Sequence, residues 1–383
     1  MARLGDICEI VSGTTPKSSH PEYWGGGINW VTPAELTDDS DIIYETQRKI
    51  TEQAVAESGL KIFPAGTVLL SSRAPIGKVA IAGIEMCCNQ GFKNLICSDV
   101  IFNKYLFYFL KRNTEYLNAL GRGATFKEIS KSIVENIEIP LPELSEQYEI
   151  VKILDKIRNL IRKLQRQQDK LDELVKSRFI EMFGDPVFNP LGWKKKTLKE
   201  VCIKLNDGTH FSPESFATGE YKYVTAKNIK ISGFDFTNIT YVPEEVHKPI
   251  YERCNPELGD VLYIKDGVTT GIAMVNTLEE EFTLLSSVAL LKQDRRIING
   301  HFLAALLNNE NMYTDIRSNM GGAAITRLTI AKLNTIKVIL PPIELQEQFA
   351  SFVTWTDKSK MAVQQSLNKL ELLKKSLMQK YFD

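Results

Sequence analysis

The segment of residues 140–185, PLPELSEQYEIVKILDKIRNLIRKLQRQQDKLDELVKSRFIEMFGD, has a degraded second copy at the end of the chain. That copy is residues 341–383, PPIELQEQFASFVTWTDKSKMAVQQSLNKLELLKKSLMQKYFD. The residues shared by the two copies are Glu143, Leu144, Glu146 and Gln147 in the first and Glu344, Leu345, Glu347 and Gln348 in the second. The matches are roughly 200 residues apart, which is the size of a domain and far longer than a solenoid repeat. The sequence therefore predicts a protein that is built twice.

Apolar residues in both copies recur in alternating steps of four and three, which is the spacing of a coiled-coil seam. The apolar seam positions are Ile150, Leu154, Ile157, Ile161, Leu164, Leu171 and Val175 in the first copy and Val353, Val363, Leu367, Leu370 and Leu377 in the second. The polar residues that interrupt the seam are Gln168 and Arg178 in the first copy and Thr356, Lys360 and Lys374 in the second. Because the interruptions differ, we expect the two helices to pair with each other rather than with themselves. A coiled coil that serves only as a dimerisation stalk is the alternative that this pattern leaves open.

The composition narrows the class of protein. The 383 residues suffice for two or three domains, and 43% hydrophobic with 25% charged residues is typical of a globular chain. The opening MARLGDICEI lacks the apolar stretch of a secretory signal and no run is long enough to span a bilayer, so we expect a cytoplasmic protein without membrane contact. The six cysteines include no CxxC pair and the four histidines are isolated, which argues against a metal site. Lys and Arg number 47, as do Asp and Glu, so any nucleic-acid contact must come from a few placed loops.

Residues 1–140 and 185–340 carry the same landmarks in the same order. The first region has short apolar runs set off by Gly, Pro, Ser and Asn, and a late helical segment that stops at Gly121. In the second, KTLKEVCIKLNDGTH corresponds to ARLGDICEIVSGTT, and LGDVLYIKDGVTTGIAMV to PAGTVLLSSRAPIGKVAI. We therefore expect two β-rich domains, each followed by a long helix, at residues 1–140, 141–184, 185–340 and 341–383. Between the landmarks the domains diverge, which fits either modules that recognise different targets or drift after an old duplication.

No catalytic motif stands out in the sequence. There is no GxxxxGK(S/T) phosphate loop, no GxGxxG, no HExxH, no GxSxG and no (N/D)PP(Y/F) tetrapeptide of an amino-methylating site. We therefore expect a chain that catalyses nothing and binds no cofactor itself. A nuclease with unpatterned carboxylates is the remaining enzymatic alternative.

The short polar loops between the strands hold the residues that could contact DNA. Small hydroxyl and cationic side chains beside glycine can approach phosphates closely and reach base edges. The candidates are Thr14, Thr15, Lys17, Arg73, Lys78, Arg122, Thr125 and Lys127 in the first domain and Thr209, His210, Lys265, Thr269, Thr270, Thr326 and Arg327 in the second. Simple solvation is the alternative for each cation, since most loop Lys and Arg residues are solvated.

The whole chain, from Met1 to Asp383, resembles the specificity (S) subunit of Type I restriction-modification systems. The resemblance rests on the helical copies that open with PLPELSEQ and PPIELQEQ, on FGDPVFNPLGW after the first helix, and on LGDICEIVSGTTPKS, LKEVCIKLNDGTH and SSRAPIGKVAI. The fold that it implies is α+β, with two β-rich target recognition domains separated by two long antiparallel coiled-coil helices and an internal pseudo-two-fold repeat. The second helical copy departs from the first, with ELQEQFASFVTW where the first has ELSEQYEIVKIL.

The resemblance also implies a function and a set of partners. Each target recognition domain would read one half of a bipartite site in double-stranded DNA, and the helices would set the spacing of the halves and dock two modification (methyltransferase) subunits. Restriction (translocase-endonuclease) subunits would complete the complex, and S-adenosylmethionine, ATP and Mg²⁺ would belong to those partners. The alternatives are the specificity component of a related system without a motor subunit, and a coiled-coil scaffold protein that does not bind DNA.

Overall fold

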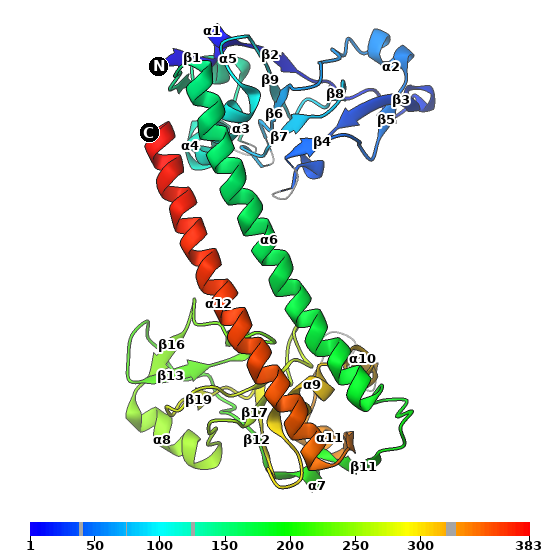
Figure 1. Ribbon diagram of the computed structural model, residues 1–383, viewed down its shortest axis with the longest axis vertical. Helices are drawn as coiled ribbons and strands as arrows, with labels where there is room; N and C mark the ends of the chain where they lie inside the picture. The colour runs from blue at the N-terminus through cyan, green and yellow to red at the C-terminus, as the bar shows by residue number, and fades with distance from the viewer. Residues whose placement is uncertain (38–40, 74, 124–126, 319–326) are drawn as a thin grey trace. The chain divides into compact units, whose positions relative to one another are not determined.

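The computed structural model describes most of the chain (Figure 1), and the described residues are 1–37, 41–73, 75–123, 127–318 and 327–383. It divides into two compact units, of which the first is Met1–Gln165 with Gln365–Asp383 and the second is Arg166–Gln364. Both divisions fall inside long helices. Each unit therefore contains one β-rich domain and a part of both helices, and both ends of the chain belong to the first unit (Figure 1).

The long helices are α6, Leu144–Phe183, and α12, Ile343–Phe382, each of 40 residues. Proline precedes both, at a position where its missing N–H leaves no hydrogen bond unmade. α6 ends before Gly184, whose φ of 72° is the left-handed conformation that commonly terminates a helix. The amide of Gly184 donates to the carbonyl of Ile180 at 2.8 Å, which closes the last turn.

The two helices pack together and run antiparallel. In the first unit the start of α6, with Ile150 and Leu154, shares an apolar cluster with Phe382 at the end of α12. In the second unit Phe183, at the end of α6, contacts Phe349 near the start of α12 with ring centroids 5.7 Å apart. Burial of large apolar side chains from both helices is the main source of stability for such a pair.

The apolar seam lies within this packing. The buried seam residues are Ile150, Leu154, Ile157, Ile161, Val363 and Leu367, and the half-buried ones are Leu164, Leu171, Val175, Val353, Leu370 and Leu377. Three of the polar interruptions have partners within the second unit. The Gln168 amide donates to Gln364 Oε1 at 3.2 Å, and Lys360 forms an ion pair with Asp172. The buried Thr356 hydroxyl donates to a carbonyl one turn earlier in its own helix, at 2.9 Å.

The first β-rich domain has a five-stranded sheet in the order β2-β9-β6-β7-β4 and a three-stranded sheet in the order β5-β3-β8, with β1 and β10 paired beside them. The strands are β1 Ala2–Arg3, β2 Cys8–Ser12, β3 Trp24–Val31, β4 Ile42–Ile43, β5 Lys49–Ile50, β6 Val68–Leu70, β7 Val79–Ala82, β8 Cys87–Cys88, β9 Lys93–Cys97 and β10 Glu138–Ile139. The helices are α1 Leu4–Ile7, α2 Glu52–Glu57, α3 Asn103–Arg112, α4 Thr114–Leu120 and α5 Lys131–Glu135, with single 3-10 turns at Pro21–Tyr23 and Pro33–Glu35. Val68, Leu70 and Leu95 of the larger sheet pack with α3 and the start of α6 in one apolar core.

The second β-rich domain has a four-stranded sheet in the order β12-β20-β17-β18 and a three-stranded sheet in the order β16-β13-β19, with the pairs β11-β21 and β14-β15 beside them. The strands are β11 Lys194–Thr197, β12 Cys202–Asp207, β13 Tyr221–Val224, β14 Ile229–Lys230, β15 Gly233–Phe234, β16 Thr240–Val242, β17 Val261–Ile264, β18 Ala273–Val275, β19 Thr283–Leu284, β20 Val288–Gln293 and β21 Lys337–Leu340. The helices are α7 Leu198–Val201, α8 Glu244–Arg253, α9 Gly300–Leu307, α10 Glu310–Ser318 and α11 Ile330–Thr335, with a 3-10 turn at Ala226–Asn228. Val261, Tyr263 and Leu291 pack with α9 and the end of α6.

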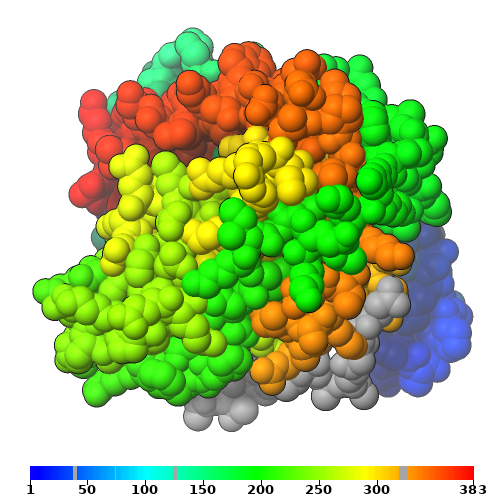
Figure 2. Space-filling model, turned by 90° about the horizontal axis from the view of Figure 1, so that it is seen from below, coloured from blue at the N-terminus to red at the C-terminus, as the bar shows by residue number. Residues whose placement is uncertain are grey.

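The pairing of β11 with β21 joins the linker that follows α6 to the segment that leads into α12. Figure 2 shows this face of the second unit, with the green linker lying beside the orange segment. The linker turns at Asn189 and Gly192, both of which have positive φ. The second domain is thus attached at both of its ends to the same short two-stranded sheet.

The two domains repeat one backbone framework. The order β2-β9-β6-β7 in the first corresponds to β12-β20-β17-β18 in the second, and the parallel pair β3 and β8 corresponds to β13 and β19. Hydrogen bonds outside the strands repeat as well. The amide of Thr14 donates to Cys88 at 3.1 Å, and the amide of Thr209 donates to Leu284 at 2.8 Å. The prediction of a protein built twice on an α+β fold is confirmed.

The structure corrects the register of the repeat at the start of the helices. The Gln147 side chain is fully buried; its Oε1 accepts from the Phe102 amide at 2.8 Å and its Nε2 donates to two backbone carbonyls at 2.9 and 3.0 Å. Gln346 makes the same set of bonds, including one from the Asn299 amide at 2.9 Å, whereas Gln348 is exposed. Gln346 is therefore the equivalent of Gln147. Matching ELSEQ to ELQEQ by identity slipped the register by two residues, because Gln occurs twice within the ELQEQ segment.

Candidate nucleic-acid interface

In the second domain, β12 and β17 finish and β20 begins at the same end of the sheet, which we call the loop end. Asp207, the last residue of β12, lies opposite Ala289, and Ile264, the last residue of β17, lies opposite Val288. The loops that follow β12 and β17 therefore emerge on either side of β20. These two loops contain most of the contact residues predicted for this domain.

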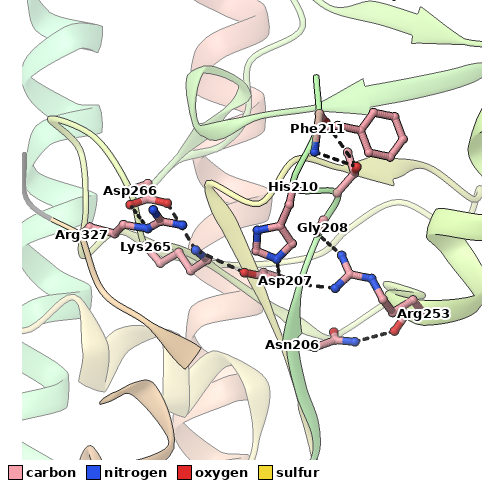
Figure 3. A network of polar contacts seen from close by, with 10 residues as sticks. Asn206, Asp207, Gly208, His210, Phe211, Arg253, Lys265, Asp266 and Arg327 are labelled. Carbon is pink, nitrogen blue, oxygen red and sulfur yellow. Dashed lines mark hydrogen bonds and ion pairs between the residues drawn. The ribbon is translucent and has the colours of Figure 1, made fainter. Parts of the chain in front are cut away.

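A buried ion cluster lies beneath the loop end (Figure 3). Lys265 is 2% exposed, and its ammonium nitrogen lies 3.2 Å from Oδ2 of Asp207 and 3.2 Å from Oδ2 of Asp266. The four residues of β17 are all buried, so the side chain that follows them also enters the interior. A buried ammonium is strongly disfavoured unless carboxylates pair with it. The lysine therefore ties together carboxylates from the ends of two strands.

Three exposed side chains surround this cluster (Figure 3): His210, Arg253 and Arg327, whose side chains are 56%, 48% and 57% exposed. His210 Nε2 lies 3.1 Å and an Arg253 guanidinium nitrogen 3.8 Å from Asp207 Oδ1. Arg327 Nε lies 3.4 Å from Asp266 Oδ1. The two carboxylates and the Lys265 ammonium thus lie inside, and the two guanidinium groups and the imidazole lie outside. Such a surface suits a phosphate backbone, and guanidinium groups can also bind guanine edges.

Glycine is required where the first loop of each domain leaves its strand. A Cβ atom on Gly208 would lie 1.9 Å from the carbonyl oxygen of Leu284, and one on Gly13 would lie 2.1 Å from that of Cys88. These loops therefore pass the neighbouring strand too closely for any side chain. The carbonyl of Gly208 also accepts a hydrogen bond from Arg253, which connects the end of α8 to this loop.

The first domain builds its loop end from different side chains. Lys93, at the start of β9, is 8% exposed, and its ammonium nitrogen lies 3.1 Å from Oε1 of Glu128. Isolated β-bridges join Glu128 to both Arg73 and Arg122. Arg122 and Lys127 are exposed, Arg73 is half-buried, and a groove of about 600 Å³ opens beside Arg122 between α4 and α5. The backbone segments that carry three predicted cations therefore meet at Glu128, whose carboxylate is paired with a buried lysine.

The other candidates of the first domain lie at the start of the first loop and in the turn between β6 and β7. Thr14 and Lys17 are exposed, and the Thr15 hydroxyl donates to the side chain of Gln90. The half-buried Lys78 donates to a backbone carbonyl at 3.2 Å. Lys78 therefore has a role within the fold that a free surface cation does not have.

Three predicted contacts in the second domain need correction. Lys265 and Thr209 are both 2% exposed and Thr270 is fully buried, so none of these side chains can touch DNA without a rearrangement. Thr209 hydrogen-bonds within its own loop, and Thr270 donates to the carbonyl of Gly267 at 2.7 Å. Thr269 is exposed. Two further predicted contacts lie outside the described residues: Thr125 and Thr326.

Sequence reasoning missed four residues of the two loop ends. Arg253 lies in the segment where the domains diverge, so no landmark identified it. Asp207 and Lys93 are strand residues, and only Lys93, which precedes the apolar run of β9, carried a signal in the sequence. Glu128 pairs with a lysine 35 positions earlier in the chain, which no local pattern predicts.

The described residues offer little for catalysis. Burial raises the pKa of the Cys88, Cys202 and Cys254 thiols to about 12, so these groups are protonated at neutral pH and are poor nucleophiles. Within the described ranges, no cluster of three or more His, Cys, Asp or Glu side chains is arranged to hold a metal ion. No helix in the part of the chain that the structure describes is both long and apolar enough to cross a membrane.

Comparison with known proteins identifies the class to which this framework belongs. The family model described as "Type I restriction modification DNA specificity domain" matches residues 1–173 and 190–372. The chain belongs to this family, and it is a non-catalytic, DNA-binding specificity subunit of a Type I restriction-modification system. The resemblance noted in the sequence is thereby confirmed.

Individual relatives agree with this assignment. The chain is 32% identical over 375 residues to the MjaIX specificity subunit of Methanocaldococcus jannaschii, covering 92% of this chain and 85% of that protein. It is 24% identical over 396 residues to the MjaVIII specificity subunit of the same organism, covering 99% and 90%. The crystal structure of the Type I S subunit from M. genitalium superimposes with a TM-score of 0.60 at 17% identity, covering 100% of this chain and 95% of that one. That structural likeness supports the fold.

Proposed function

We propose that each β-rich domain reads one half of a bipartite site in double-stranded DNA, while α6 and α12 set the distance between the halves and dock two modification subunits. The proposed boundaries are residues 1–140 and 185–340 for the two recognition domains and residues 141–184 and 341–383 for the two helices. One observation carries the proposal. The two domains share a backbone framework down to single hydrogen bonds, yet they present different side chains at their loop ends. Two readers of different sequences are expected to differ in this way.

The helices are suited to act as a ruler. Each has 40 residues, and at about 1.5 Å per residue an α-helix of that length extends about 60 Å. A helix pair resists bending far better than a loop does, because its backbone hydrogen bonds and buried seam fix its geometry. The spacing of the two half-sites would then follow from helix length.

A groove on the first unit supports the docking of a modification subunit. It has a volume of about 600 Å³ and lies between α3 and α6. Its lining combines the apolar groups of Phe102, Tyr148, Val151 and Leu160 with four lysines, Lys104, Lys152, Lys156 and Lys163, of which Lys104 is paired with Asp155 in the same groove. An amphipathic helix with acidic flanks has the complementary chemistry. In the second unit, Trp355 of α12 takes the repeat position of Lys156 and is 60% exposed, as expected of an aromatic anchor at an interface.

The chemistry of the complex is assigned to its partners. S-adenosylmethionine would serve adenine methylation in the modification subunits, with the target base flipped out of the duplex. ATP and Mg²⁺ would serve the restriction subunits, where they drive translocation and cleavage. This chain directs the complex to its DNA sequence. It acts in the cytoplasm, where chromosomal and entering DNA are found.

The test is methylome sequencing of a host that carries the chain with its modification subunit. We expect a motif of two specified halves separated by a fixed number of unspecified base pairs. Insertion of seven residues after Gln167 in α6, matched by seven after Gln364 in α12, preserves the heptad seam and lengthens the pair by about 10 Å. The spacer should then grow by about three base pairs, at 3.4 Å each. A continuous motif, or an unchanged spacer in a folded variant, would contradict the proposal.

A further inference from the structure

Both domains place a buried lysine ammonium under the loop end, but they take it from different strands. In the first domain it is supplied by Lys93 of β9, and in the second by Lys265, which follows β17. Lys93 of β9 lies opposite Ser12 of β2. At the corresponding place in the second domain, Ala289 of β20 lies opposite Asp207 of β12. The strand that supplies the lysine in one domain therefore has alanine at the same position in the other.

The position of Lys265 has its own equivalent in the first domain. The Leu328 amide donates to the Lys265 carbonyl at 2.8 Å, and the Ile129 amide donates to the Ser72 carbonyl at 3.0 Å. Ser72 is therefore the residue that corresponds to Lys265, and its hydroxyl lies 3.5 Å from the ammonium of Lys93. The pair Ser72 and Lys93 in one domain is thus replaced by Lys265 and Ala289 in the other.

The residues around the ammonium exchange their charges as well. An isolated β-bridge joins Arg73 to Glu128 in the first domain, and the corresponding bridge joins Asp266 to Arg327 in the second. In each case the buried lysine lies close to the acidic member, with Lys93 at 3.1 Å from Glu128 and Lys265 at 3.2 Å from Asp266. The arginine stands on the opposite side of the bridge. The ammonium, the carboxylate and the arginine thus recur together, although their places in the chain differ.

We propose that Lys93 and Lys265 are positioning residues for DNA recognition. The ammonium fixes the carboxylate of the bridge, and the carboxylate fixes the segment that carries the surface arginines. What each domain requires is an ammonium at this location, and either strand can supply it. This inference rests on the proposed function, because it assumes that each loop end reads its own half-site.

A matched control separates positioning from simple burial of an ion pair. Lys292 lies in the same sheet, its side chain is 15% exposed, and its ammonium nitrogen is 3.0 Å from carboxylate oxygens of both Glu257 and Asp260. It is a half-buried lysine with two acidic partners, but Asp260 precedes β17, at the end of the strand away from the loops. A purely structural role predicts equal consequences for the loss of Lys265 and of Lys292.

The experiment uses the full chain with its modification subunit and compares methylomes of the wild type, Lys265→Met, Lys292→Met and the double variant K265S/A289K, which copies the arrangement of the first domain. We expect Lys265→Met to lower discrimination at one half-site by about tenfold or more and to leave the other half unchanged. Lys292→Met should preserve discrimination at both half-sites, when its stability in urea equals that of Lys265→Met. K265S/A289K should restore the discrimination that Lys265→Met loses.

Hydrogen exchange of the same variants provides a readout that does not depend on DNA. Lys265→Met should speed exchange of the Leu328 amide, and K265S/A289K should restore its protection. Equal loss of discrimination in Lys265→Met and Lys292→Met, or no restoration in a folded K265S/A289K, would overturn the inference. A wild-type methylome without a bipartite motif would instead overturn the proposed function, and the Leu328 amide would still decide whether the lysine positions its loop.

Discussion

The two β-rich domains share strand order, strand register and loop hydrogen bonds, yet the charges at their loop ends are arranged in opposite order. Arg73 faces Glu128 across one bridge, and Asp266 faces Arg327 across its counterpart. The framework is maintained by main-chain hydrogen bonds and apolar contacts, which many sequences can satisfy. Under the proposed function, recognition depends on a few side chains whose location in space is maintained while their place in the chain changes. A sequence alignment of the two domains therefore identifies their shared fold more easily than it identifies the side chains proposed to contact DNA.

The largest effect is expected from separating the two readers. A fragment of residues 1–192 retains the first domain and all of α6 but lacks α12, so its apolar seam would be exposed at a cost of about 1.5–3 kcal/mol per large side chain. A second fragment can cover that seam, because Phe183 takes the repeat position of Phe382. With the modification subunit, the fragment should dimerise and direct methylation to an interrupted palindrome. Methylation of an asymmetric site, or a monomer that directs none, would mean that the two domains are not equivalent readers of one half-site each.

The glutamine that begins each helix provides a test of the corrected register. Gln147→Ala and Gln346→Ala each leave buried backbone groups without partners, and we expect each to lower the free energy of unfolding by about 2–4 kcal/mol. Gln348→Ala is the control, since an exposed side chain should change stability by less than about 0.5 kcal/mol. Urea unfolding of the three variants measures the difference. A large effect of Gln348→Ala with a small one of Gln346→Ala would restore the register read from sequence identity.

How much the sequence could predict depends on the kind of interaction. The seam was predictable residue by residue, because helical periodicity is local and burial follows from it. The repeat and the strand-rich domains were predictable from landmarks such as LGDIC and LKEVC. The loop ends were not: Lys265 looked like a loop cation because Asp207, one of its two partners, is distant in the sequence. Arg253 reaches the loop end from the end of α8, and only the folded arrangement brings it to Gly208.

A smaller effect should come from the polar interruption of the seam. Thr356 is fully buried at the repeat position of Ile157, and its hydroxyl is satisfied within its own helix. Thr356→Val should change the free energy of unfolding by no more than about 1 kcal/mol, because it removes a donor and keeps the shape. Ile157→Thr should cost about 1–3 kcal/mol, because it buries a hydroxyl and leaves a small void. Equal costs in urea unfolding would mean that the two halves of the seam are packed alike.

The loss of one surface cation should lower the affinity for DNA modestly, and only where that cation lies at the loop end. Arg253→Ala removes a guanidinium at the loop end, and the slope of log affinity against log salt should fall by about one if it contacts a phosphate. Arg296→Ala is the matched control, because its side chain is 87% exposed and it pairs with Asp294 at the other end of β20. Fluorescence anisotropy across a salt series compares the two. An equal change in both slopes would remove Arg253 from the interface.

The smallest expected effect concerns pH. His301 takes the place in α9 that Lys104 takes in α3, and burial lowers its pKa while the nearby Asp357 partly opposes the shift. Protonation is therefore easier in the unfolded chain, so stability should fall as pH drops below the unfolded value of about 6.5 and level off below the folded value. His301→Gln should flatten this part of the urea-unfolding profile. An unchanged profile would assign the pH dependence to other groups.

If one framework carries two independent readers, the methylomes of Arg73→Ala and Arg327→Ala, in the full chain with its modification subunit, should change in different halves of the motif. The two arginines belong to equivalent β-bridges, Arg73 in the first domain and Arg327 in the second. We predict that Arg73→Ala relaxes base preference in one half of the motif only, that Arg327→Ala relaxes the other half only, and that the double variant relaxes both with an unchanged spacer. Relaxation of the same half by both variants, or of both halves by either one, would mean that the two domains do not read DNA independently.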